Sequence, residues 1–126
     1  MNNKKRILIA DDEAALLQTM AFSLKRKGYD TVTVRDGKAA WKKIIEASQN
    51  NEHYDLIITD IQMPGLSGAD LITKIRQAGI ITPILAITGF GNMKMVVDLM
   101  RSGCTDYLDK PFTMNEFINH ITELIN

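Results

Sequence analysis

The stretch RILIADDE (Arg6–Glu13) places four apolar residues directly before three acids. A short continuous apolar run of this kind is typical of a strand that is covered on both faces. The acids that follow repel one another, because two unit charges 4 Å apart cost about 4 kcal/mol at an effective dielectric constant near 20. A buried strand that ends in such a cluster indicates that positive charge lies close to the acids or is bound by them.

Similar apolar runs alternate with segments of helical periodicity along the rest of the chain. We predict strands at Arg6–Ala10, Thr31–Val34, Asp55–Thr59, Ile84–Thr88 and Thr105–Leu108. We predict helices over Glu13–Lys27, over Gly37–Ala47 with Asp36 as N-cap, over Ala69–Gln77 and Met93–Arg101, and around Phe117, Ile121 and Leu124. Five repeats of a strand followed by a helix predict an α/β fold, a parallel sheet with helices on both faces.

Composition limits the classes of function. The 126 residues are a length that suits one domain with one core, and the formal net charge is zero. A neutral chain lacks the basic surface that binds nucleic acid or an anionic membrane. The apolar run after Lys4-Lys5-Arg6 is too short for a signal peptide or a membrane span, so we expect a cytoplasmic protein. Cys104 is the single cysteine and is expected to be a small buried residue.

Polar side chains follow the strands at one edge of this predicted sheet. Asp11 and Asp12 end the first strand, Asp60 the third and Thr88 the fourth, and Lys110 follows the fifth. Ligands of open α/β sheets bind outside the carboxyl ends of the strands, and in a parallel sheet these ends share an edge. We therefore expect three carboxylates, a hydroxyl and an ammonium to converge there.

This set of side chains suits Mg²⁺, which prefers oxygen ligands and keeps several waters. No His or Cys lies at these strand ends, which argues against zinc. Lys110 and Mg²⁺ together carry three positive charges, which balance three aspartates. Such a site tolerates an Asp carboxylate that acts as a nucleophile and forms an aspartyl phosphate, a transfer that needs mainly positioning and charge stabilisation.

The motifs at these strand ends resemble those of one family. They are Asp11-Asp12, the segment TDIQMPGLSG around Asp60, Thr88 after the fourth strand, and DYLDKPF with Lys110-Pro111. Each motif alone is weak, but their order and spacing together are specific. Over its whole length the chain resembles the receiver domain of two-component response regulators, including the single-domain chemotaxis type. The resemblance implies one receiver domain over residues 1–126 and a flavodoxin-like, doubly wound sheet in the order 2-1-3-4-5.

The resemblance also implies roles at the acidic edge. Asp60 corresponds to the phosphoacceptor, although a turn acid at a strand end is the simpler explanation for an isolated Asp. Asp11 and Asp12 correspond to the Mg²⁺ pair, with Asp12 the direct ligand; helix capping would explain one of them. The backbone carbonyl of Gln62 would complete the metal site. Lys110 would pair with the phosphoryl oxygens rather than lie in solvent as most lysines do.

Further implied roles concern the switch. The Lys110–Pro111 peptide bond would be cis. The Thr88 hydroxyl would move to the phosphoryl group and Tyr107 would turn inward, although a β-branched strand residue and ordinary core packing are the simpler explanations. Gln62 and Phe90 occupy the positions that tune hydrolysis, and because Phe90 offers no polar group to orient water we expect slow self-dephosphorylation.

Two other groups of residues have simpler interpretations. Met63, Met93, Met95 and Met100 could form an adaptable partner surface, but we interpret them as core filler. His53 and His120 show no ligand spacing and are predicted to be surface residues.

Several functions remain in competition. A receiver would take its phosphoryl group from a sensor histidine kinase or a histidine phosphotransfer domain, and it would catalyse only its own phosphorylation and dephosphorylation. An aspartyl-phosphate hydrolase would need a second Asp where Gln62 stands. A nucleotide or flavin binder would need a phosphate loop after the first strand, where the acids repel phosphate. The remaining alternative is a receiver-like interaction module that is never phosphorylated.

The sequence leaves the output domain or downstream protein, the cognate kinase, the stimulus and the phosphoryl lifetime open. It also leaves open whether this is a stand-alone protein or part of a longer regulator. A homodimer formed on phosphorylation through the fourth helix, fifth strand and fifth helix is a hypothesis, which an unchanged mass in light scattering after activation would contradict.

Overall fold

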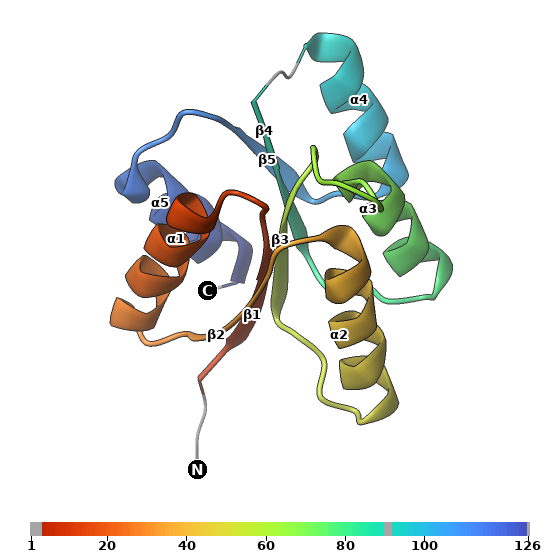
Figure 1. The fold of residues 1–126 in the computed structure, drawn as a ribbon, viewed down its shortest axis with the longest axis horizontal. Coiled ribbons are helices and arrows are strands. Elements are labelled where there is room, and N and C mark those ends of the chain that lie inside the picture. The colour runs from red at the N-terminus through yellow and green to blue at the C-terminus, as the bar shows by residue number, and fades with distance from the viewer. Residues whose placement is uncertain (1–3, 90–91, 126) are drawn as a thin grey trace.

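The computed structural model describes residues 4–89 and 92–125. In these residues five parallel strands in the order β2-β1-β3-β4-β5 alternate with five helices (Figure 1). The strands are β1 (Arg6–Ala10), β2 (Asp30–Val34), β3 (Leu56–Asp60), β4 (Ile84–Thr88) and β5 (Asp106–Asp109). The helices are α1 (Ala14–Arg26), α2 (Gly37–Gln49), α3 (Gly68–Gln77), α4 (Met93–Ser102) and α5 (Met114–Ile125). The predicted flavodoxin-like α/β fold and its strand order are confirmed.

The predicted strand boundaries are right for β1 and β4 and differ by one residue elsewhere. β2 begins one residue earlier, and β3 and β5 are each shifted one residue toward the C-terminus. The shift arises because main-chain pairing continues through polar residues: Asp60 pairs with Ile87, and Asp109 pairs with Thr88. Asp60 is therefore held inside the sheet ladder.

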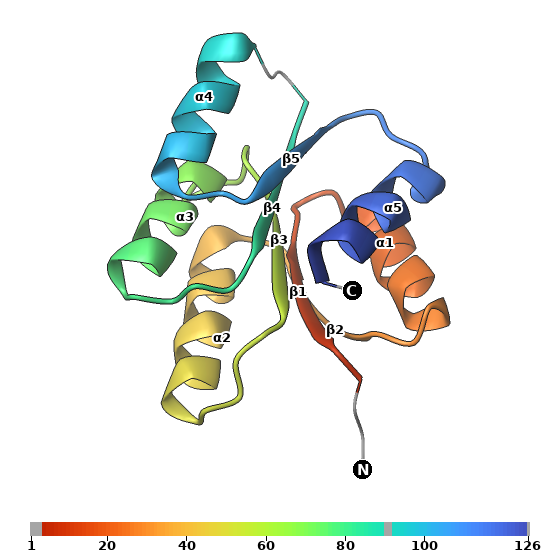
Figure 2. The same cartoon turned by 180° about the vertical axis from the view of Figure 1, so that it is seen from behind.

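The sheet separates two apolar cores. Helices α1 and α5 cover one face, and α2, α3 and α4 cover the other (Figures 1 and 2). Alternate residues of a strand point to opposite faces, so Leu8 of β1 joins the α2–α4 core while Ile7 and Ile9 join the α1–α5 core. All three are fully buried. The continuous apolar run in β1 thus follows from burial on both faces.

Side-chain caps set where most of the helices begin. The Asp36 carboxylate accepts from the Ala39 N–H at 2.7 Å, which confirms the predicted N-cap of α2. Thr113 and Glu116 form a reciprocal capping box at the start of α5, just after the loop that carries Lys110. Glu13 occupies the N-cap position of α1 but makes no capping hydrogen bond with its side chain.

Arg76 ties three segments together at the end of α3. Its Nε donates to the Gly103 carbonyl at 2.9 Å, and one terminal nitrogen donates to the Ile80 and Thr82 carbonyls, both at 2.8 Å. These carbonyls belong to the turn after α4 and to the connection between α3 and β4. Arg76 therefore fixes the C-terminal end of α4 against α3. Burial lowers the pKa of the Arg76 guanidinium.

The prediction that the methionines fill the core is wrong for Met93 and Met100 of α4, whereas Met95 of the same helix is partly buried and packs against the α2–α4 core. Met93 is 77% exposed and Met100 is 44% exposed, whereas Met63 is buried. Met93 and Met100 are seven residues apart, so they share one face of α4, and that face is turned away from the sheet. Leu99 lies on the core side of α4 and is buried. The predicted burial of Cys104 is confirmed, and burial raises the pKa of its thiol to about 11.

His120 has a partner that the sequence did not indicate. Its Nδ1 lies 2.7 Å from Oδ2 of Asp106, so α5 contacts β5 through this pair. Both side chains are partly exposed. In the part of the chain that the structure describes, no helix combines the length and apolar character needed to cross a membrane.

Candidate metal and phosphoryl site

The carboxyl ends of the strands bring the predicted acids together. One carboxylate oxygen from each of Asp11, Asp12 and Asp60 lies within 4.8 Å of the other two. Asp11 follows β1, and its N–H donates to the Val34 carbonyl, which extends the β1–β2 ladder by one bond. Asp60 is the last residue of β3 and is 4% exposed. The loop at β1 and the end of β3 thus place one exposed carboxylate, that of Asp12, beside two buried ones.

Asp11 contains the least satisfied polar atom of this cluster. Its Oδ1 accepts from the Glu13 N–H at 2.9 Å. Its Oδ2 is the buried side-chain atom for which the described residues offer no hydrogen-bond partner. An orphaned buried carboxylate oxygen is costly unless something binds it. Burial raises the pKa of Asp11 to about 6; the Glu13 N–H opposes this shift and the charge of Asp60 adds to it.

The donor set fits a hard divalent cation. Three carboxylates lie close together, and one of their oxygens, Asp11 Oδ2, lacks a hydrogen-bond partner among the described residues, although the Lys110 ammonium lies 3.6 Å away. Mg²⁺ is bound in proteins by one or two carboxylates together with waters and phosphate oxygens. Asp11, Asp12 and Asp60 are therefore the residues that would hold it.

We expect Asp11→Asn to stabilise the metal-free protein at about pH 8 and to have little effect at about pH 4. The pKa of Asp11 is about 6 in the folded protein and 3.8 without burial. Its contribution to stability is therefore fully present below about pH 4 and is lost as the pH rises through about 6. Asparagine avoids this loss, and we expect a gain of about 2 kcal/mol at the higher pH.

Urea unfolding in the presence of a chelator would measure this difference at several pH values. Asp12→Asn serves as the control, because Asp12 is the exposed carboxylate of the same cluster and its removal should change stability by less than about 1 kcal/mol. An Asp11→Asn variant less stable than the wild type at about pH 8 would contradict the expectation.

Lys110 supplies the positive charge that the opening stretch calls for. Its Nζ lies 3.2 Å from Asp60 Oδ2, 3.2 Å from Glu13 Oε1 and 3.6 Å from Asp11 Oδ2. Burial alone would lower the pKa of Lys110, but the charges of Asp11 and Asp60 and the hydrogen bonds to Asp60 and Glu13 raise it above its usual value. The Lys110 N–H donates to the Thr88 carbonyl, and the peptide bond to Pro111 is cis.

The loop after β3 folds back onto Asp60. The Gln62 N–H donates to Asp60 Oδ1 at 3.3 Å, and the Gly68 N–H donates to the Ile61 carbonyl at 3.0 Å. A Cβ on Gly68 would lie 2.2 Å from the Asp60 carbonyl oxygen. The backbone of the candidate nucleophile thus requires glycine at the start of α3, and Gly68 is the last residue of the TDIQMPGLSG motif.

The two predicted switch residues lie on neighbouring strands. Thr88 ends β4, is fully buried, and its hydroxyl lies 3.6 Å from the Met95 sulfur of α4. Tyr107 lies on β5, is partly buried and packs against the α2–α4 core. Phe90, the predicted tuning residue, lies outside the described residues.

Glu13 is a site residue that sequence reasoning missed. We interpreted the third acid of RILIADDE as part of a helix start, but its carboxylate is bound to Lys110. The sequence signal for this role is the position of Glu13, directly after the Asp11-Asp12 pair and before α1. That position faces the loop after β5, which carries Lys110. A cavity of about 410 Å³ lies beside this ion pair and is lined by Glu13, Leu16, Gly89, Lys110, Pro111 and Phe112.

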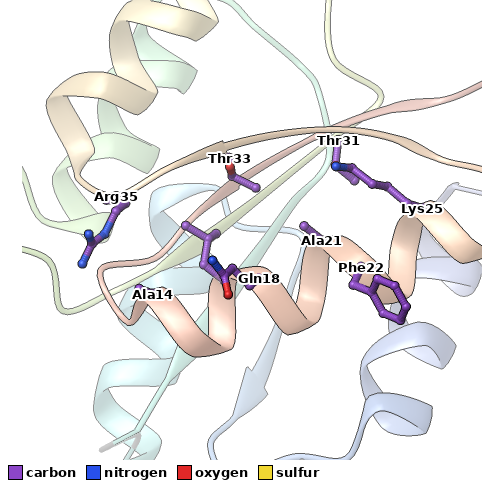
Figure 3. Close-up of a pocket in the computed structure, with 9 residues that line it drawn as sticks. Ala14, Gln18, Ala21, Phe22, Lys25, Thr31, Thr33 and Arg35 are labelled. Atoms are coloured by element: carbon purple, nitrogen blue, oxygen red, sulfur yellow. The ribbon is translucent and has the colours of Figure 1, made fainter.

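A second cavity, of about 530 Å³, lies between α1 and β2 (Figure 3). Gln18, Phe22 and Lys25 line it from α1, and Thr33 and Arg35 line it from β2 and the residue after it (Figure 3). None of the predicted site residues lines this cavity. The candidate site is therefore the strand edge, where charged groups converge, and not this groove.

Comparison with known proteins agrees with this fold. Residues 7–122 match the response regulator receiver domain family. The chain is 35% identical to the alkaline phosphatase synthesis transcriptional regulatory protein PhoP of Bacillus subtilis, over 89% of this chain and 45% of that protein. It is 32% identical to the transcriptional regulatory protein ResD of Bacillus subtilis, over 98% of this chain and 49% of that protein.

Solved receiver structures superimpose closely on the chain. The receiver domain of the Francisella response regulator 1452 matches with a TM-score of 0.87 at 31% identity and covers 97% of each chain. The chemotaxis protein CheY4 of Vibrio cholerae matches with a TM-score of 0.87 at 26% identity, over 96% of this chain and 98% of that chain. The chain belongs to the receiver domain family of two-component response regulators. It spans about half the length of the curated relatives that it matches.

Proposed function

We propose that Asp60 accepts a phosphoryl group in a Mg²⁺-dependent reaction, and that the donor is a phosphohistidine on a sensor histidine kinase or a histidine phosphotransfer domain. The observation that carries the proposal is the meeting of Asp11, Asp12 and Asp60 with the Lys110 ammonium at the end of the sheet. Clustered carboxylates of this kind require positive charge, and bound Mg²⁺ would supply the charge and polarise the phosphoryl oxygens.

In the proposed transfer an Asp60 carboxylate oxygen attacks phosphorus, and the bond between phosphorus and the histidine nitrogen breaks. The imidazole leaves as the neutral base after taking up a proton, and an aspartyl phosphate remains. Asp11, Asp12, Asp60 and the Gln62 carbonyl would hold the metal. Lys110, 3.2 Å from Asp60, is placed to neutralise a phosphoryl oxygen. Such catalysis acts by position and charge.

Phosphorylation would then act as a switch. We propose that the Thr88 hydroxyl leaves the Met95 sulfur, a weak acceptor, for a phosphoryl oxygen. Tyr107 would turn toward the space that Thr88 vacates, and the surface formed by α4, β5 and α5 would change. The modification biases an equilibrium between two states of one fold. That surface would bind an output domain or a downstream protein, or it would form a homodimer with a second copy of the chain.

In this proposal residues 1–126 form one receiver domain that works in the cytoplasm and binds neither membrane nor nucleic acid directly. It is a phosphoacceptor that catalyses only its own phosphorylation and dephosphorylation, and not an enzyme acting on other substrates. Gln62 and Phe90 tune the hydrolysis of the aspartyl phosphate in this proposal, and self-dephosphorylation is slow because Phe90 offers no polar group to orient water.

Acetyl phosphate tests the proposal without a kinase. We expect the intact mass of the wild type to increase by one phosphoryl group with Mg²⁺ present, and to stay unchanged when a chelator replaces the metal. Asp60→Asn should accept none, since the amide is a poor nucleophile, whereas Asp109→Asn, which removes an exposed strand-end carboxylate, should react like the wild type. A folded wild-type protein that accepts no phosphoryl group would instead favour the unphosphorylated interaction module.

A further inference from the structure

The ammonium of Lys110 is shared between two carboxylates of different exposure. It lies 3.2 Å from Asp60, whose side chain is 5% exposed, and 3.2 Å from Glu13, whose side chain is 60% exposed. The Lys110 side chain is itself only 18% exposed. Asp60 is the proposed phosphoacceptor, but Glu13 has no place in the transfer chemistry described above.

The Glu13 carboxylate is turned toward Lys110 and not toward the first turn of α1. Shorter polar side chains such as Asp usually accept a hydrogen bond from that turn when they stand at an N-cap. Glu13 makes no such bond in α1, while its own N–H orients Asp11. The backbone N–H of Glu13 therefore bonds to the acidic cluster, and its side chain forms an ion pair with Lys110 in the loop after β5.

This ion pair lies beside open space. Glu13 and Lys110 both line the cavity of about 410 Å³ between the start of α1 and Pro111. A phosphoryl group on Asp60 needs the Lys110 ammonium as a hydrogen-bond donor. The three N–H donors of that ammonium must then be shared between Glu13 and the phosphoryl oxygens. Glu13 and the phosphoryl oxygens thus compete for one cation.

We propose that Glu13 is a positioning residue that competes with the phosphoryl group for Lys110 and so holds the unphosphorylated state. The inference rests on the proposed function and adds a regulatory contact to it. Losing the Glu13–Lys110 pair frees the ammonium for the phosphoryl group. The wild type therefore binds a phosphoryl group less tightly than a variant without this contact.

Beryllofluoride, which mimics a phosphoryl group on a carboxylate, measures the competition without chemical turnover. At fixed Mg²⁺ we expect Glu13→Gln to bind beryllofluoride about fivefold more tightly than the wild type, the size of a partly exposed ion pair. Glu13→Asp keeps the charge but is one methylene shorter, so it should lose the contact and bind more tightly as well. NMR titration gives each affinity, and acetyl phosphate labelling should change in the same direction.

Two controls separate the contact from general charge. Asp109→Asn removes an exposed carboxylate adjacent to Lys110 in the chain, and it should leave the affinity unchanged. In a Lys110→Ala background Glu13→Gln should have no effect, because the two residues act through one interaction.

Several outcomes would overturn the inference. Unchanged affinity in Glu13→Gln would do so, as would wild-type behaviour of Glu13→Asp or an equal gain in the Lys110→Ala background, since these would leave only long-range repulsion. If the wild type accepts neither beryllofluoride nor a phosphoryl group, the proposed function itself fails. If it accepts both and Glu13→Gln behaves identically, only the role of Glu13 fails.

Discussion

Gly68→Ala is expected to destabilise the fold by about 3 kcal/mol, at the upper end of the usual cost of overpacking. A methyl group there would lie 2.2 Å from the Asp60 carbonyl oxygen and 2.7 Å from the Ile61 Cα. Both neighbours are backbone atoms, which have no rotamer into which they can move. Relief of the clash requires β3 or the start of α3 to shift, and either shift breaks the hydrogen bond from Gly68 to Ile61.

Urea unfolding at neutral pH would give the free energy of unfolding of this variant from its midpoint and slope. Gly89→Ala is the matched control, because the nearest atom to its added methyl group, Lys110 Cδ, is 4.0 Å away. That substitution should change stability by less than about 1 kcal/mol. Equal stabilities of the two variants would show that the β3–α3 loop accommodates a side chain.

Lys110→Ala is expected to cost about 3 kcal/mol of stability at about pH 8 without divalent metal, because it leaves two buried carboxylates uncompensated. Asp11 is 0% exposed and Asp60 is 4% exposed, and Lys110 is the cation that lies against both. The cost should shrink as the pH falls below the pKa of Asp11, about 6, since a protonated carboxyl needs no counter-charge. Added Mg²⁺ should restore part of the loss by binding the folded state.

Thermal and urea unfolding, with and without Mg²⁺, would measure this pattern. Lys42→Ala is the control: Lys42 is an exposed residue of α2, so its removal should change stability by less than about 1 kcal/mol at every pH. A loss in Lys110→Ala that is the same at about pH 5 and about pH 8, and insensitive to Mg²⁺, would mean that Lys110 acts through its apolar stem and not through its charge.

The sequence predicted the parts of the molecule that follow from chain order and burial. The apolar runs of β1 and β4 predicted the bounds of these strands without error, whereas β3, which is equally buried, continues through the polar Asp60. The acid cluster was predictable because strand ends in a parallel sheet share an edge, so Asp11, Asp12 and Asp60 could be brought together without knowing any side-chain position.

Contacts between distant segments were less accessible to sequence reasoning. Glu13 meets Lys110 across 97 positions, and Arg76 reaches Gly103 across 27. No local pattern encodes either pair, because each depends on how the loops cross at the sheet edge. The exposure of Met93 was missed for a related reason: methionine suits both core and surface, and only the rotation of α4 decides between them.

The three carbonyls held by Arg76 have a mechanical consequence for α4. The helix is anchored where it ends, at Gly103, while its beginning lies near Met95, whose sulfur faces the Thr88 hydroxyl. If Thr88 releases Met95, α4 can pivot about its C-terminal end, which the guanidinium of Arg76 holds. With a rise of about 1.5 Å per residue α4 is about 15 Å long. A small rotation about its C-terminal end therefore displaces the exposed Met93, at the other end of the helix, the furthest.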